Sequence, residues 1–221
     1  MPIRANLLSE IQAALGSAIS PGLSTASAHS DIFEAYTFSL VLRAARAEGA
    51  SIAYYNVDGT TPSTFVFRTS PGYIFSTQHA YTHAEISIPG KPVLEAHIGV
   101  RVEGKSRVLH ECDVAVMFKD EAETCRMNSV SPRSAKVILA AECKFYASNL
   151  PLGMARAFLG LASDISCMAR FLVVNTGSDS VEQLLSHRRE DWEHQVVPGS
   201  NTVPRIENQF REVFKRFKAL R

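Results

Sequence analysis

Residues 136–146 (KVILAAECKFY) restrict the fold of this chain more than any other segment. They form a nearly continuous apolar run, as expected for a β-strand that is buried on both faces. After Asn149 and Pro151 a helical pattern runs to about Met168, and proline suits the first turn of a helix. Residues 170–175 (RFLVVN) then form a second apolar strand pattern. Two buried strands joined by a helix predict a sheet that is covered by helices.

The remaining segments predict further strands before this unit and helices at both ends of the chain. Apolar residues recur at helical spacing over residues 3–15, 31–47, 180–187 and from 204 onward. Strand patterns occupy residues 51–57, 64–68, 93–102 and 107–118, with a hairpin turn at 103–106. Residues 70–92 contain two Pro-Gly turns and no clear pattern, and residues 119–135 are expected to be a polar loop. The order predicts an α/β fold with a mixed central β-sheet flanked by helices.

With 221 residues the chain is long enough for one substantial domain with short additions. We expect an N-terminal helix and linker at 1–30, a core at 31–178 and a C-terminal helical extension, packed on the core, at 179–221. No apolar stretch approaches the roughly 20 residues that span a bilayer, and the N-terminus lacks the apolar core of a signal peptide. A cytoplasmic location without a membrane partner is therefore the expectation.

The spacing of the cysteines and the net charge exclude few classes of function. The four cysteines form no CxxC pair and no zinc-type spacing, so we expect them to be reduced. The formal net charge is +1, which neither requires nor excludes a polyanionic partner, and a nucleic-acid surface would have to be a local patch. The chain contains no phosphate-binding glycine motif and no zinc finger.

Charged residues appear abruptly at the ends of two predicted strands. Side chains two apart on a strand point to the same face, so Glu142 and Lys144 share one face, and Glu111 shares another with Asp113. Burying charges without partners is costly, so these groups need compensation.

Two interpretations of these charges remain open. In the first, Lys144 forms a structural ion pair with Glu142 or Asp113. In the second, Asp113 and Glu142 bind a hard cation such as Mg²⁺, which favours a few carboxylates together with water and substrate oxygens. The backbone carbonyl of Cys143 would add a ligand, and Lys144 would orient or deprotonate the attacking water and offset charge in the transition state.

An aspartate near the end of a hairpin's second strand, followed by E-x-K on the next strand, resembles the PD-(D/E)XK nuclease superfamily. The matching residues are Asp113 in HECDVAVM and Glu142 and Lys144 in ILAAECKFY. The resemblance covers roughly residues 31–175. Cys112 stands where the motif has proline, and 28 residues separate Asp113 from Glu142, so no subfamily is assigned.

The resemblance implies a restriction-endonuclease-like fold and a Mg²⁺-dependent nuclease, with Mn²⁺ as a substitute, that cuts DNA endonucleolytically. Since one such site cuts one strand, a homodimer is expected, and sequence specificity would come from loops such as 59–92 or 119–135 or from a separate specificity or effector protein. Many members add a glutamate from the helix before the hairpin, and Glu34 is the candidate. Asp31-x-x-Glu34 equally fits a helix capping box, and the two roles are compatible.

Three basic residues are candidates for contact with nucleic acid. Arg156 lies one turn into the helix after Lys144, and Lys215 and Lys218 lie on the basic side of the C-terminal helix. Solvated helix faces explain all three equally well.

Two alternative functions stay open: a catalytically inactive nuclease-fold binding or regulatory protein, and a module that senses a small ligand in the histidine-rich region 70–110. His79 and His83 in that region are four apart, but without a third ligand they are expected to be ordinary exposed or core histidines.

Overall fold

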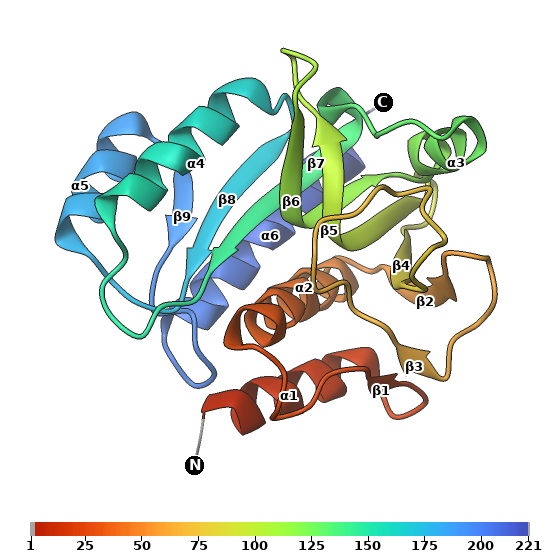
Figure 1. Ribbon diagram of the computed structural model, residues 1–221, viewed down its shortest axis with the longest axis horizontal. Coiled ribbons are helices and arrows are strands. Elements are labelled where there is room, and N and C mark those ends of the chain that lie inside the picture. The colour runs from red at the N-terminus through yellow and green to blue at the C-terminus, as the bar shows by residue number, and fades with distance from the viewer. Residues whose placement is uncertain (1–2, 221) are drawn as a thin grey trace.

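The apolar run at residues 136–146 forms β7 (Val137–Lys144), an interior strand of a seven-stranded sheet (Figure 1). The computed structural model describes residues 3–220, so residues 1, 2 and 221 of the predicted terminal segments lie outside the described residues. The other strands are β1 (Ser20–Pro21), β2 (Ser51–Asn56), β3 (Thr64–Phe65), β4 (Thr82–Ser87), β5 (Leu94–Glu103), β6 (Leu109–Phe118), β8 (Ala169–Val174) and β9 (Asp191–Glu193). The helices are α1 (Ile3–Leu15), α2 (His29–Ala47), α3 (Lys119–Asn128), α4 (Leu152–Asp164), α5 (Asp179–Arg188) and α6 (Thr202–Ala219), with a 3-10 turn at Ser134–Lys136.

The main sheet is mixed, as the sequence predicted. Its order is β2-β4-β5-β6-β7-β8-β9, and neighbouring strands are antiparallel from β2 to β7 and parallel from β7 to β9. The helix α4 connects the parallel strands β7 and β8. The short strands β1 and β3 pair separately. The predicted α/β class with helices flanking a mixed sheet is therefore confirmed.

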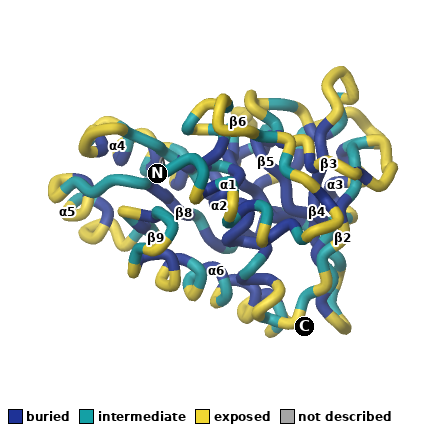
Figure 2. The backbone as a smooth tube through the Cα atoms, turned by 90° about the horizontal axis from the view of Figure 1, so that it is seen from below, coloured by how far each residue is buried: buried dark blue, intermediate teal, exposed yellow. Residues whose placement is uncertain are grey.

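Alternate residues of β8 divide the core between the two faces of the sheet. Phe171 and Val173 pack in the cluster that contains α1, α2 and α6, whereas Leu172 and Val174 pack with α4 and α5. A third cluster joins α3 to β5, β6 and β7. Figure 2 shows buried positions running through the sheet and α2, with the outer turns of α4 and α6 exposed.

Helix α6 carries the predicted apolar stripe. Phe210, Phe214 and Phe217 are fully buried against the core, so this segment belongs to the same hydrophobic cluster as α1 and α2. No helix within residues 3–220 combines the length and the apolar character needed to cross a membrane.

The prediction of a polar loop at 119–135 was wrong, because residues 119–128 form α3. The helix buries only a narrow stripe that includes Ala122 and Cys125, so its sequence shows few apolar residues at helical spacing. Acidic Asp120 and Glu121 in its first turn and Arg126 in its last turn favour the helix dipole. Strands β4 and β9 were also missed, and α4 ends at Asp164 rather than near Met168.

Candidate functional site

Asp113 occupies the point where β6 and β7 stop pairing. The ladder between the two strands ends at the pair Val114–Ala141. The next N–H of β7 that points toward β6 is that of Cys143, and it donates to the Asp113 Oδ2 atom at 2.7 Å. Asp113 is 4% exposed, so this bond holds its carboxylate in one place. The N–H and C=O groups of one strand residue point toward the same neighbour, so the Cys143 carbonyl also faces β6.

Lys144 links the two predicted metal ligands. Its Nζ atom lies 2.7 Å from the Glu142 Oε1 atom and 3.5 Å from the Asp113 Oδ2 atom. The end of β7 thus brings Asp113, Glu142 and Lys144 together, as strand alternation predicted. The ion pairs of the structural interpretation are present, and they do not exclude a metal.

Helix α2 adds Glu34 to this group. The first turns of α2 pack on the end of β7, where Phe145 stacks on His29 at 4.9 Å between ring centroids and meets the edge of Phe33 at 5.7 Å. Glu34 then lies close enough to Asp113 for the two carboxylates to repel each other. The capping-box prediction for Asp31 and Glu34 was wrong, because Ala28 is the N-cap and no side chain caps the helix.

The carboxylates of Glu34, Glu111, Asp113 and Glu142, here called the acid cluster, carry more negative charge than Lys144 compensates. Burial and the charge of Asp113 raise the pKa of Glu34 from 4.5 to about 9. The same two causes raise the pKa of Glu142 to about 7 and also raise that of Glu111. Burial raises the pKa of Asp113 despite Lys144, and the carboxylates keep the pKa of Lys144 above its usual value although burial lowers it. The cluster therefore favours an added cation.

The acid cluster opens onto a cavity of about 380 Å³ beside α4, lined in part by Glu111, Glu142 and Phe158. No three of its carboxylates come within 4.8 Å of one another among the described residues. A bound ion would therefore take one or two carboxylates directly and complete its shell with other oxygens, which is the pattern that Mg²⁺ prefers. His110, at the rim, is hydrogen-bonded to Asp164 at 2.6 Å.

The structure does not bring the three basic candidates to the acid cluster. Arg156 is exposed on α4 and does not line the cavity beside it. Lys215 pairs with Glu212 at 2.6 Å, Lys218 pairs with Glu48 at 2.7 Å, and both lysines lie on α6.

A second buried polar group was not predicted. His83 on β4 and His97 on β5 stack with ring centroids 5.1 Å apart, and their Nε2 atoms lie 3.7 and 2.9 Å from the Glu95 Oε2 atom. We call these three residues the histidine cluster. Its members are near enough to share a metal ion, but Arg126 donates to both Glu95 oxygens at 2.6 and 2.8 Å. The guanidinium already neutralises Glu95, so an entering cation would meet a like charge.

The only local sequence signal for this group was Glu95 and His97 two apart on one strand. His79, four residues before His83 in the sequence, is exposed in a loop. Neither His79 nor His83 lies on a helix. Comparison of the chain with protein-family models, with curated proteins and with solved structures gave no match in any of the three cases.

Proposed function

We propose that this protein is a divalent-metal-dependent nuclease that hydrolyses phosphodiester bonds, with DNA as its substrate and endonucleolytic cutting as its mode. The observation that carries the proposal is the junction of β6 and β7, where Asp113, Glu142 and Lys144 meet beside an open cavity. Asp113 and Glu142 are the proposed metal ligands, with the Cys143 carbonyl as a third and Glu34 as a further acid.

The donor set fits Mg²⁺, with Mn²⁺ as a substitute. The oxygens of Asp113, Glu142 and Cys143 face the same region, and their hard character suits these ions. When bound, such an ion polarises a phosphate oxygen and lowers the pKa of a coordinated water molecule. The excess of buried carboxylates over cations gives the site a reason to bind it.

Lys144 supplies a fixed positive charge in this scheme. The neighbouring carboxylates keep its pKa raised, so the ammonium group stays protonated at neutral pH. A protonated lysine cannot accept a proton from water, so of its two predicted roles we favour orientation of the nucleophile and stabilisation of negative charge on the phosphate.

The order of elements also agrees with the restriction-endonuclease-like fold that we propose. Helix α2, the antiparallel strands β5, β6 and β7, helix α4 and the parallel strand β8 give helix–strand–strand–strand–helix–strand. Strands β2, β3 and β4 are inserted after α2, and α3 is inserted before β7. A homodimer, a separate specificity or effector protein and a cytoplasmic location stay predictions.

The test is incubation of plasmid, single-stranded DNA and RNA with Mg²⁺ or Mn²⁺, and with EDTA as the metal-free control. We expect Glu142→Gln and Lys144→Met each to reduce cleavage by roughly a hundredfold or more, because the first removes the charge of a proposed metal ligand and the second removes the positive charge at the reacting phosphate. Glu182→Gln, an exposed change on α5, is the matched control and keeps full activity.

The main alternative is an inactive nuclease-fold binding protein. It predicts nucleic-acid binding without cleavage in any metal, together with no calorimetric Mg²⁺ or Mn²⁺ signal that depends on Asp113. Cleavage that is equal in wild type, Glu142→Gln and Lys144→Met would place the activity outside this site and refute the assignment.

A further inference from the structure

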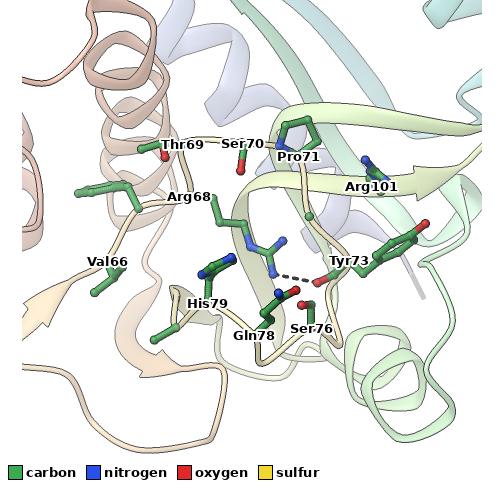
Figure 3. A pocket seen from close by; sticks show the side chains of 13 residues that line it. Val66, Arg68, Thr69, Ser70, Pro71, Tyr73, Ser76, Gln78, His79 and Arg101 are labelled. Atoms are coloured by element: carbon green, nitrogen blue, oxygen red, sulfur yellow. Dashed lines mark hydrogen bonds between the residues drawn. The ribbon is translucent and has the colours of Figure 1, made fainter.

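A second cavity, of about 520 Å³, lies between the loop at residues 66–80 and β5 (Figure 3). We call it the arginine pocket. It is lined by two arginines, one histidine and several hydroxyl and amide groups, and by no carboxylate; the polar side chains are Arg68, Thr69, Ser70, Tyr73, Ser76, Gln78, His79 and Arg101. The chain has no acidic residue between Asp58 and Glu85, so the loop brings no internal counter-ion.

Aromatic rings, rather than carboxylates, hold both arginines. The Arg68 guanidinium lies 3.7 Å from the centroid of the Tyr81 ring, and its Nη2 atom donates to the Tyr73 carbonyl at 2.8 Å, the dashed line in Figure 3. Arg101 lies 4.9 Å from the centroid of the Tyr73 ring. Within residues 3–220, neither arginine has a carboxylate oxygen within 4 Å.

Two other half-buried arginines of the molecule are neutralised by carboxylates. Arg126 is paired with Glu95 at 2.6 Å, and Arg43 with Glu207 at 2.7 Å. Arg68 is half-buried as well, and burial lowers its pKa. Glu111 lies opposite Arg101 on the neighbouring strand, but no carboxylate lines the pocket, so the two guanidinium groups make the arginine pocket a site for an anion.

The pocket lies one strand away from the acid cluster. Gly99 on β5 stands between the pairs Ile98–Val114 and Val100–Cys112, and therefore opposite Asp113. Its carbonyl accepts the N–H of Gly72 at 2.9 Å, and a Cβ atom on Gly99 would lie 3.3 Å from the Ser70 carbonyl oxygen. The loop is thus seated on the strand directly beside Asp113.

Arg101 shares the face of the acid cluster. It is the cross-strand partner of Glu111, and directly opposed residues of antiparallel strands lie on the same face. Adjacent strands lie about 4.8 Å apart, so the pocket and Asp113 fall within the span of neighbouring nucleotides of one strand.

We propose that the arginine pocket binds a phosphate group of the substrate strand near the phosphate that the acid cluster cleaves. The inference rests on the proposed nuclease function for the identity of the strand. Arg68 and Arg101 supply planar forks of N–H donors that match phosphate oxygens, and the hydroxyl groups of the loop add neutral donors. The contact positions the strand and does not depend on its base sequence.

The test separates binding from cleavage. A fluorescent single-stranded oligonucleotide is titrated by anisotropy in Ca²⁺ in place of Mg²⁺, at several salt concentrations. We expect Arg101→Gln to weaken binding roughly tenfold or more and to reduce the salt slope by about one, since one phosphate contact is lost. Arg188→Gln, an exposed arginine on α5, removes the same charge and leaves affinity and slope near the wild-type values.

Two further arms complete the design. Arg68→Gln repeats the test from the other side of the pocket, and thermal unfolding checks that each variant is folded. Inorganic phosphate and a mononucleotide compete with the oligonucleotide; millimolar competition supports a phosphate subsite, and competition at micromolar concentration would instead mark a free-nucleotide site and overturn the assignment to a strand.

Failure of this inference and failure of the nuclease function give different results. Cleavage that requires Glu142, with unchanged affinity in both folded arginine variants, would refute the arginine pocket and keep the nuclease. Binding that requires Arg101, with no cleavage in any metal, would refute the nuclease and keep the pocket.

Discussion

Replacing Glu34 by Gln removes one ionisable group from the acid cluster with little change of shape. Glu34 is half-buried on α2, has no ion pair among the described residues, and is repelled by Asp113, Asp31 and Glu111. Burial and this repulsion raise its pKa from 4.5 to about 9. In the absence of metal the folded protein therefore holds a proton on Glu34 at neutral pH, and the unfolded chain does not.

The sign and size of the effect on stability follow from this difference. The folded state binds the proton more tightly, so the contribution of Glu34 is most favourable below pH 4.5 and is lost as the pH rises toward 9. Each pH unit in that interval is worth about 1.4 kcal/mol, which gives about 3 kcal/mol at pH 7. Solvent screens part of this at a half-buried group, so we expect Glu34→Gln to stabilise the metal-free protein by about 2 kcal/mol at pH 7.

The assay is urea unfolding of wild type and Glu34→Gln in EDTA at pH 4.5, 7 and 8.5. The difference in unfolding free energy is expected to be near zero at the lowest pH and to grow as the pH rises. Mg²⁺ then reduces the difference: at about a hundredfold excess over its dissociation constant it stabilises wild type by about 2.7 kcal/mol, and it stabilises the variant less. Glu182→Gln serves as the exposed control and changes neither profile.

Parallel pH profiles of the unfolding free energy for wild type and Glu34→Gln would show that the pKa of Glu34 is not raised in the folded state. The reasoning from the acid cluster would then fail. A variant that is less stable than wild type at pH 7 would show instead that Glu34 has a structural role.

Three further changes test other parts of the structure. Glu95→Ala leaves the half-buried Arg126 guanidinium without its partner and is expected to cost about 3 kcal/mol in urea unfolding, with the metal dependence of cleavage unchanged. Phe210→Ala removes a fully buried ring of α6 and is expected to cost about 3–5 kcal/mol in the same measurement; a cost near zero would show that α6 does not complete the core. Gly72→Ala places a Cβ atom on the Arg68 Nη1 atom, so it should lower oligonucleotide affinity in Ca²⁺ without unfolding the protein.

The part of the site that could be predicted from the sequence is the part that depends on local geometry. Alternation along a strand puts Glu142 and Lys144 on one face over a distance of two residues, and the apolar run before them identifies the strand. Asp113 joins them because adjacent strands of a meander are usually neighbours. The sheet class follows from the same rules.

The histidine cluster could not be predicted, because it depends on the register of strands that are far apart in the sequence. His83 lies opposite His97, one residue beyond the pair Ala84–Ala96. The sequence of β4 has no strong alternating pattern that would predict a strand there. The arginine pocket was missed for the same reason, since Arg101 meets the 66–80 loop only where Gly72 pairs with β5 beyond the end of β4. The role of Glu34 was left open because a helix start and an acidic ligand show the same residue pattern.

The acid cluster and the histidine cluster differ in how their charge is balanced, and this difference distinguishes their roles. In the histidine cluster, burial alone would raise the pKa of Glu95, but hydrogen bonds from Arg126 and His97 outweigh it and lower the pKa. Burial and the neighbouring His97 lower the pKa of His83 to about 3, so the group is an ionised carboxylate with a guanidinium and neutral rings. In the acid cluster the positive charge of Lys144 does not balance the carboxylates, and the pKa values of Glu34 and Glu142 are raised. A buried cluster whose charges are already balanced stabilises a fold. A buried cluster with too little positive charge, at the mouth of a cavity, is suited to bind a cation.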